Sequence, residues 1–413
     1  MTKVLSIWQR ERDDDLVIKI LLFLISPFCG LVYSFYRIRT KSSFIILFLF
    51  AIVYGFSMIV ESSLYMSDAT YYLDGNHHRA DFEQYVSMTY ENFVDMILHP
   101  FENGERDIYH VIMKFLVSRF TSNYHVFFCC ISMVFMAFSL KSLKYFIKEL
   151  PSKLNFICYV LLFLFLNIQI FQINGVRFYT AAWIAIYAIL QIYISKDRKY
   201  LLLLAVTPLV HSAFWVLLLL VIIKSFTGNF SLLWKILFLT SFFASELFTN
   251  FISSNINVLP DSFSEWGAFY LNTQTQLGDG GRFYSVFGML SRYCIYFLIF
   301  LLIRISNKLE GKTQSIFIFL IILATFSSAA QAISNLGGRF FSLLIPIFAY
   351  VCIVNYTIIL ANYGKKFFYL IPICFFYSFF YYMPSLYMKV LEPCFFYASP
   401  IYLFNRYLIE FVV

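Results

Sequence analysis

Apolar runs of about 20 residues recur along the whole chain, and a run of that length can cross the hydrocarbon core of a bilayer as a helix. Of the 413 residues, 61% are hydrophobic and only 13% are charged, whereas a soluble domain carries about 25% charged residues. A larger core cannot hide the missing charge, because a soluble protein of this size still needs a polar surface. We therefore predict an all-α polytopic integral membrane protein with about 11–12 transmembrane segments.

Hydropathy places the predicted spans along the chain. Helices are expected near residues 17–36, 43–61, 124–145, 154–173, 176–195, 231–250, 284–305, 314–333, 340–361 and 366–383. The run 200–223 is long enough for one span, but Pro208, His211 and Ser212 interrupt its middle, which favours a broken helix or a short hairpin. The last segment, 400–413, is too short to span comfortably.

Clusters of lysine and arginine between these runs predict the orientation, because cytoplasmic loops are enriched in both. The clusters are Arg37, Arg39 and Lys41; Lys141, Lys144, Lys148 and Lys153; Lys196, Arg198 and Lys199; Arg304, Lys308 and Lys312; and Lys365 and Lys366. All of these clusters lie on the same side of the membrane if 200–223 is a hairpin that returns to Lys224. The opposite side then receives 62–123, 251–283, 334–339 and 384–399. The net charge of +8 follows from this topology and does not indicate nucleic-acid binding.

The predicted extracytoplasmic loop 62–123 holds much of the polar chemistry. Ten of the 23 acidic residues and five of the six histidines lie between Glu61 and His125. Within the loop, an apolar pattern predicts an interfacial helix that leads into the next span; it comprises Ile108, Ile112, Phe115, Leu116 and Phe120. We interpret residues 1–413 as one membrane domain with a structured cap in this loop and a second extracytoplasmic loop at 251–283.

An arginine element recurs three times with the pattern Gly-x-Arg-Phe-aromatic, at residues 175–179, 280–284 and 337–341. In the predicted topology each copy begins a helix on the extracytoplasmic side, where the positive-inside bias and the helix dipole both disfavour arginine. An anion resolves both conflicts, because glycine admits a ligand close to the backbone and arginine pairs bidentately with phosphate. We predict that Arg177, Arg282 and Arg339 bind a diphosphate. The alternative is that each contacts lipid headgroups.

His211 lies between two leucine-rich runs, and an ionisable group within a membrane usually faces a cavity or marks a site. Its ordinary pKa of about 6.5 suits proton exchange with a hydroxyl group, although a packing histidine is an equal alternative. Asp81 is the second candidate catalytic residue. Three further residues are candidate ligands for a glycan or acceptor: Arg79, Tyr85 and Asp279. Two cations of the cap are expected to contact headgroups: Lys114 and Arg119.

Motifs of several enzyme classes do not occur in the sequence. The chain contains no P-loop, dinucleotide fingerprint, His-Glu-x-x-His zinc motif or Gly-x-Ser-x-Gly elbow. Nucleotide-driven transport, redox chemistry and serine hydrolysis therefore lose support. We expect neither a metal nor a cofactor.

Four short stretches follow one another in a specific order, at residues 79–85, 120–128, 174–178 and 210–213. In order and spacing, residues from about 60 to 225 resemble the EpsG-like, Wzy-type polysaccharide polymerases of the bacterial envelope. The second half resembles that family in hydropathy and in Arg339 at a late helix. The chain departs from the family in having Val176 before Arg177, where a Gln-Arg or similar polar pair is common. An acid-proline-glycine stretch of the family is represented only by Glu105, Arg106 and Asp107.

The resemblance implies a GT-C-like glycosyltransferase of the bacterial inner membrane with its active site on the periplasmic face. It implies transfer of an undecaprenyl-diphosphate-linked oligosaccharide onto another lipid-linked repeat unit, which builds O antigen or capsule. Such a reaction would invert the anomeric centre without a metal, since arginines can stabilise the leaving diphosphate. The implied partners are the lipid-linked donor and acceptor, membrane lipids and a chain-length regulator, with no nucleic acid.

Three other functions remain open from the sequence. An O-antigen ligase would use similar arginines but deliver the glycan to lipid A core or to protein. A flippase of lipid-linked oligosaccharide would favour inverted repeats and charged sites near the midplane, whereas the arginine elements lie at predicted helix ends on one side. A membrane acyltransferase is supported only by His211.

Overall fold

The computed structural model describes residues 13–59, 74–100, 107–170, 175–228, 231–255, 279–332, 334–372, 391 and 393–409. This part of the chain is built from helices and contains no strand, so the predicted all-α fold is confirmed. The helices of the first half are α1 (Leu16–Ile25), α2 (Pro27–Tyr36), α3 (Lys41–Phe56), α4 (Asp74–Ser87), α5 (Tyr90–Leu98), α6 (Ile108–Ser118), α7 (Tyr124–Glu149), α8 (Phe156–Phe165) and α9 (Val176–Tyr193). Those that follow are α10 (Tyr200–Val210), α11 (Phe214–Thr227), α12 (Ser231–Ser241), α13 (Ser245–Asn255), α15 (Asp279–Arg304), α16 (Gln314–Ala329), α17 (Ser334–Val354), α18 (Tyr356–Tyr363), α19 (Lys366–Tyr369) and α21 (Pro400–Ile409).

Several of these helices are suited to a bilayer. Among the described residues, four helical segments are long and apolar enough to cross a membrane: Tyr124–Glu149, Val176–Tyr193, Gly311–Ala329 and Leu336–Val354. Seven shorter apolar helices accompany them. The chain is therefore a multi-pass membrane protein, while the expected number of about 11–12 segments stays a prediction.

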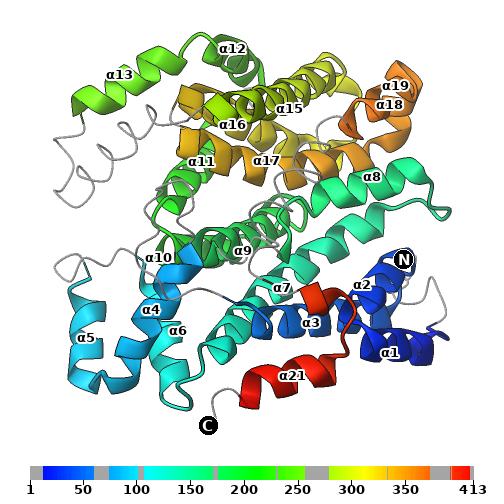
Figure 1. The fold of residues 1–413 in the computed structure, drawn as a ribbon. Helices are drawn as coiled ribbons and strands as arrows, with labels where there is room; N and C mark the ends of the chain where they lie inside the picture. The colour runs from blue at the N-terminus through cyan, green and yellow to red at the C-terminus, as the bar shows by residue number, and fades with distance from the viewer. Residues whose placement is uncertain are drawn as a thin grey trace.

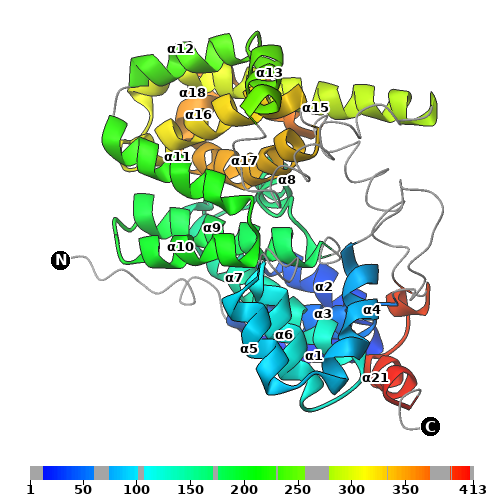
Figure 2. The same cartoon turned by 90° about the vertical axis from the view of Figure 1, so that its left-hand side faces the viewer.

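The helices form two groups that meet along α7, α8 and α9 (Figures 1 and 2). In one group α3 packs against α2 and α7, and α1 and α21 lie beside it. In the other group α16 packs against α12 and α17, and α17 reaches α8. Helix α9 lies between α7 and α10, and the cap helices α4 and α5 pack on α6. A single apolar core runs through both groups, from Phe50 through Trp183 to Leu344.

The single helix predicted at 17–36 is wrong, because the structure divides it into α1 and α2. Ser26 separates them with an extended backbone at φ −154° and ψ 129°. The residue before a proline avoids the helical region, and Pro27 then suits the first position of a new helix. The two helices fold back closely, since a Cβ atom at Gly30 would lie 2.9 Å from Cβ of Phe23. Hydropathy alone did not register this break.

The interruption predicted within 200–223 is confirmed. Helix α10 ends at Val210, His211 is extended, and α11 begins at Phe214. Two other predicted spans are also divided. The run 231–250 becomes α12 and α13, and 340–361 becomes the end of α17 followed by α18.

The basic loops meet at one end of the bundle, as the orientation argument predicted. The guanidinium of Arg39 donates to the carbonyl oxygens of residues 151 and 152, at the loop between α7 and α8. Nζ of Lys312 lies 2.8 Å from Oε2 of Glu149, at the end of α7. These contacts bring the loops after α2, α7 and α15 together. The ends of α9 and α17 also reach these loops, since the hydroxyl groups of Tyr145 and Ser195 lie 2.6 Å apart and the N–H of Glu310 donates to Oδ1 of Asn355 at 2.8 Å. Helices α9 and α17 therefore begin at the opposite end of the bundle.

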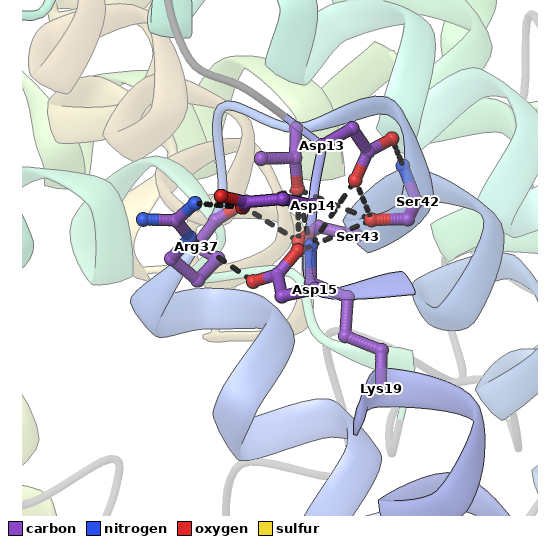
Figure 3. Close-up of polar contacts among 8 residues, drawn as sticks. Asp13, Asp14, Asp15, Lys19, Arg37, Ser42 and Ser43 are labelled. Carbon is purple, nitrogen blue, oxygen red and sulfur yellow. Dashed lines mark hydrogen bonds and ion pairs between the residues drawn. The ribbon is translucent and has the colours of Figure 1, made fainter. Parts of the chain in front are cut away.

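A buried charge cluster fixes the first helix at this basic end (Figure 3). Lys19 is fully buried, and its Nζ donates to Oδ1 of Asp15 at 2.7 Å and to the hydroxyl groups of Thr40 and Ser42. Nε of Arg37 donates to the other oxygen of Asp15 at 3.0 Å. Burial alone would raise the pKa of Asp15, but the hydrogen bond and charge of Lys19, with the charge of Arg37, hold this pKa below its usual value. The cluster thus joins α1 to the loop between α2 and α3.

We expect Lys19→Met to lower the free energy of unfolding by about 3 kcal/mol, because a buried ion pair loses its cation. Arg37 stays beside Asp15, which keeps the loss at the lower end of the range for such pairs. The measurement is thermal unfolding in detergent, monitored by the reaction of a thiol-specific dye with Cys158 and Cys352, which are buried in the folded protein.

The matched control is Lys199→Met. Lys199 also pairs with an aspartate, Asp197, at 3.0 Å, but its side chain is 72% exposed. An exposed pair contributes about 0–1 kcal/mol, so this variant should unfold almost as the native protein does. Equal stability of the two variants would contradict the structural importance of the buried cluster.

Candidate functional site

The carboxylate of Asp107 is the polar centre of the end opposite the basic loops. Asp107 precedes α6, and its side chain is only 3% exposed. Its Oδ2 accepts a hydrogen bond from Nη1 of Arg177 at 3.1 Å, and its Oδ1 accepts one from the backbone N–H of Ser212 at 2.7 Å. One buried anion therefore joins the start of α6, the first turn of α9 and the break between α10 and α11.

Arg177 lies where the sequence predicted it, at a helix start. It is the second residue of α9, after Gly175 at the N-cap position, and its side chain is 30% exposed. A guanidinium group carries five N–H donors in a planar fork. An arginine that binds one carboxylate oxygen can therefore bind an anionic ligand with its other donors.

His211 and Arg339 lie next to each other, and both pack against the ring of Phe178. Nε2 of His211 lies 3.5 Å from Nη1 of Arg339, and Nδ1 of His211 accepts a hydrogen bond from the backbone N–H of Ala213 at 3.1 Å. The ring centroid of Phe178 lies 5.3 Å from that of His211 and 5.2 Å from Cζ of Arg339. Asp107 accepts hydrogen bonds both from Arg177 and from the N–H of Ser212, the residue after His211, so the two arginines border the same cluster.

Arg339 lies deeper in its helix than predicted. Helix α17 begins at Ser334, so Arg339 is its sixth residue and belongs to the second turn. The preceding glycines are packing residues: a Cβ atom at Gly337 would lie 2.7 Å from the carbonyl oxygen of Ala330, and one at Gly338 would lie 3.0 Å from Nη2 of Arg292. The expectation that this copy begins a helix and lets its backbone approach a ligand is therefore wrong.

The other predicted site residues are not brought into this cluster by any described contact. Asp81 and Arg79 lie on α4, and Arg282 and Asp279 lie at the start of α15, but the side chains of all four fall outside the described residues. Tyr85 is buried, with its hydroxyl 3.8 Å from Sδ of Met96. Their roles in catalysis or binding stay predictions.

Two cations of the cap have protein partners that the sequence did not indicate. Nη1 of Arg119 donates to the carbonyl oxygen of Met88 at 3.1 Å, and Nη2 donates to that of Val86 at 3.2 Å, just at the end of α4. Lys114 is fully buried, with Nζ 5.2 Å from the ring centroid of Tyr85. The expected headgroup contact is therefore wrong for Lys114, which is fully buried, whereas for the exposed Arg119 it stays a prediction. The contacts of both residues hold α4 against α6.

Sequence reasoning did not single out Asp107 and Phe178 as site residues. Asp107 was one of ten acids between Glu61 and His125, and only the short acidic stretch compared with the family pointed to its position. Phe178 belongs to the arginine element, but the sequence analysis assigned a role only to the arginine. Within the described part of the chain, no group of three or more His, Cys, Asp or Glu residues could hold a metal ion.

A family model described as the EpsG family matches residues 70–399, which include every member of the cluster. The chain belongs to the EpsG family. The match reaches well beyond the first half that carried the resemblance, through α17 and onward. No curated protein and no solved structure matches the chain, so the GT-C-like architecture stays a prediction.

The pair of Asp107 and Arg177 should show strong energetic coupling. In a double-mutant cycle with Asp107→Asn and Arg177→Gln, we expect a coupling of about 1–3 kcal/mol, because the carboxylate is nearly fully buried. Thermal unfolding in detergent gives the change in unfolding free energy, relative to the native protein, for the two single variants and the double variant.

A cycle at the basic end is the control for that measurement. Glu149 and Lys312 are 2.8 Å apart, yet their side chains are 23% and 47% exposed. Their cycle, with Glu149→Gln and Lys312→Gln, should give a coupling below about 1 kcal/mol. Additive effects of the Asp107 and Arg177 substitutions would show that the buried contact does not hold the site together.

Proposed function

We propose that this EpsG-family protein is a polysaccharide polymerase that transfers a glycan from undecaprenyl diphosphate to a lipid-linked acceptor. The observation that carries the proposal is the meeting of Arg339 and His211 on Phe178, beside Arg177. Helices far apart in the sequence thereby direct two permanent cations and an imidazole to one place. A diphosphate is the ligand whose charge and geometry such a pair of guanidinium groups fits.

In the proposed reaction, the acceptor hydroxyl oxygen attacks the anomeric carbon of the donor. The bond from that carbon to the diphosphate oxygen breaks, its electron pair leaves with the diphosphate, and the configuration inverts. The hydroxyl proton passes to a base, for which His211 and Asp81 are the candidates. Charge grows on the diphosphate as it departs, so Arg177 and Arg339, with Arg282 as the predicted third ligand, bind the transition state more tightly than the ground state.

The position of the cluster supports a periplasmic active site. It lies at the starts of α9 and α17, opposite the loops that hold Arg39 and Lys312. Basic loops of inner-membrane proteins face the cytoplasm. The cluster would then face the periplasm, where undecaprenyl-linked repeat units are assembled into O antigen or capsule in the family that the chain resembles.

Lysine should be a poor substitute for arginine at this site. We expect Arg339→Lys to lower the polymerisation rate about 10–100-fold, and Arg339→Ala about 100–1,000-fold, because the ammonium group cannot bind phosphate oxygens in a bidentate manner. The assay supplies purified protein in nanodiscs with an undecaprenyl-diphosphate-linked repeat unit and resolves the products by gel electrophoresis.

Lys308→Ala is the control for this series. Lys308 is a cation at the opposite end, where its Nζ donates to Oδ1 of Asn362 at 2.8 Å. Its removal should leave the product ladder unchanged. If the alanine variants of Arg177, Arg282 and Arg339 all make polymer of native length and amount, the assignment of these arginines to diphosphate binding is wrong.

Deletion of the gene distinguishes the proposed polymerase from its alternatives. We expect surface polysaccharide with single repeat units, because ligation and export would continue without polymerisation. Gel analysis of the cell envelope provides the measurement. Unattached long polymer would indicate a ligase instead, and loss of all extracytoplasmic material would indicate a flippase.

A further inference from the structure

Arg292 is a cation within an apolar helix. It lies in α15, which covers the run 284–305 that hydropathy predicts to span the membrane. At 1.5 Å per residue, Arg292 is about 18 Å along this helix from Arg304 at the basic end, and a hydrocarbon core is about 30 Å thick. An ionisable residue at such a depth usually faces the interior of the bundle and marks a binding site or a pathway.

The exposure pattern of α15 shows that Arg292 is directed toward protein. The lipid-facing stripe of this part of the helix consists of large apolar side chains that are about half exposed: Met289, Leu290, Tyr293 and Phe297. Arg292 belongs to another stripe, at the helical spacing i, i+3, i+4 and i+7 with Ile295, Tyr296 and Ile299, which are all buried. Its guanidinium group is therefore directed at neighbouring helices and not at lipid headgroups.

Helix α17 is the neighbour that Arg292 contacts. A Cβ atom at Gly338 would lie only 3.0 Å from Nη2 of Arg292, so the guanidinium lies against the backbone of α17. Cζ of Arg292 lies 6.0 Å from the ring centroid of Phe341, which is one turn further along. Arg339 projects about 100–160° around the helix axis from Gly338 and Phe341. Arg292 and Arg339 therefore lie on two different faces of α17.

The charge of Arg292 is not balanced by the protein. In the part of the chain that the structure describes, Arg292 has neither a hydrogen bond nor an ion pair. Elsewhere in the bundle a carboxylate accompanies a cation held between helices, as Asp15 does for Lys19 and Asp107 does for Arg177. A guanidinium group stays charged, and a charge at this depth is unfavourable without an anion. An anionic ligand between α15 and α17 accounts for this arginine.

We propose that Arg292 binds a second diphosphate, that of the lipid-linked acceptor, separately from the diphosphate beside Arg339. This inference rests on the proposed function, in which two lipid-linked substrates react and each carries a diphosphate. Like charges repel, and two faces of one helix keep the two groups apart. The donor diphosphate leaves and needs the cluster of Arg177 and Arg339. The acceptor keeps its own diphosphate, which only has to be held.

Three substitutions separate the charge of Arg292 from the packing around it. Arg292→Gln removes the charge. Gly338→Ala keeps the charge but displaces it, because the added Cβ would have only atoms of Arg292 as close neighbours on other elements. Tyr296→Phe is the control on the same buried stripe: it removes a hydroxyl that donates to Oγ of Ser327 at 3.0 Å and keeps the ring that packs on Phe341. Thermal unfolding in detergent first shows that each variant is folded.

Titration with farnesyl diphosphate counts the sites in phosphatidylcholine nanodiscs, with farnesol as the uncharged control. We expect two diphosphates to bind the native protein and Tyr296→Phe. Arg292→Gln should weaken one site about 10–100-fold, as expected for hydrogen bonds to a charged group, and Gly338→Ala should weaken the same site by a smaller factor. Arg339→Gln should weaken the other site. A single site in the native protein, or two unchanged sites in Arg292→Gln, would overturn the proposal.

The source of the phosphate is tested by adding phosphatidylglycerol to the nanodiscs. We expect both diphosphate sites to persist. Loss of the site that depends on Arg292 would show that this arginine binds a phospholipid headgroup instead, which would overturn the assignment to the acceptor.

Kinetics distinguish the acceptor from the donor. The assay uses a lipid-linked donor whose own acceptor hydroxyl is blocked, and the concentrations of donor and acceptor are varied separately. We expect Arg292→Gln to raise the KM for the acceptor about 10–100-fold, with little change in the KM for the donor. A rise in the KM for the donor alone would overturn the proposal. If two diphosphates bind but the native protein makes no polymer, the proposed function fails while the separate site at Arg292 stands.

Discussion

A buried carboxylate must be matched by hydrogen-bond donors and positive charge, and Asp107 imposes that requirement at the end of the bundle opposite the basic loops. Arg177 supplies the charge and Ser212 supplies a backbone N–H. Because Arg177 belongs to α9 and Ser212 to the break between α10 and α11, hydrogen bonds to a single anion hold α9 next to that break. The break in turn carries His211, so the location of the imidazole follows from the solvation of a neighbouring acid.

The two ends of the bundle use charge in different ways. At the basic end, Lys19 and Asp15 form a closed cluster in which hydroxyl groups take up the remaining donors of the ammonium. At the opposite end, Arg177 is 30% exposed although its carboxylate partner is buried. The first arrangement is suited to structural stability, since the protein encloses both the ammonium of Lys19 and the carboxylate of Asp15. The second leaves guanidinium surface accessible, as a binding site requires.

Features that depend on residues close together in the sequence could be predicted, whereas features that depend on residues far apart in the sequence could not. The break at His211 was predicted because proline and polar residues mark it locally, and the position of Arg177 was predicted because its glycine begins a helix. The Ser26-Pro27 break carried an equally local signal that hydropathy outweighed. The pairing of Asp107 with Arg177 could not be predicted, because the sequence around each residue does not indicate which of the ten acids between Glu61 and His125 the arginine contacts. The start of α17 at Ser334 was also missed, because Gly337 and Gly338 read as a helix boundary in the sequence but lie inside the helix, packed against Ala330 and Arg292.

The repeated arginine element shows why similar local sequences need not serve one physical purpose. At its first copy, Gly175 is an N-cap and Arg177 lies at an end of α9, where the dipole disfavours a cation and the carboxylate of Asp107 offsets that cost. At its third copy, Gly337 and Gly338 lie inside α17 and permit contact with Ala330 and Arg292. What the two copies share is a following phenylalanine and an arginine directed toward the same cluster. The glycines therefore meet the separate packing needs of each helix, while the arginine is the feature through which both copies reach the cluster.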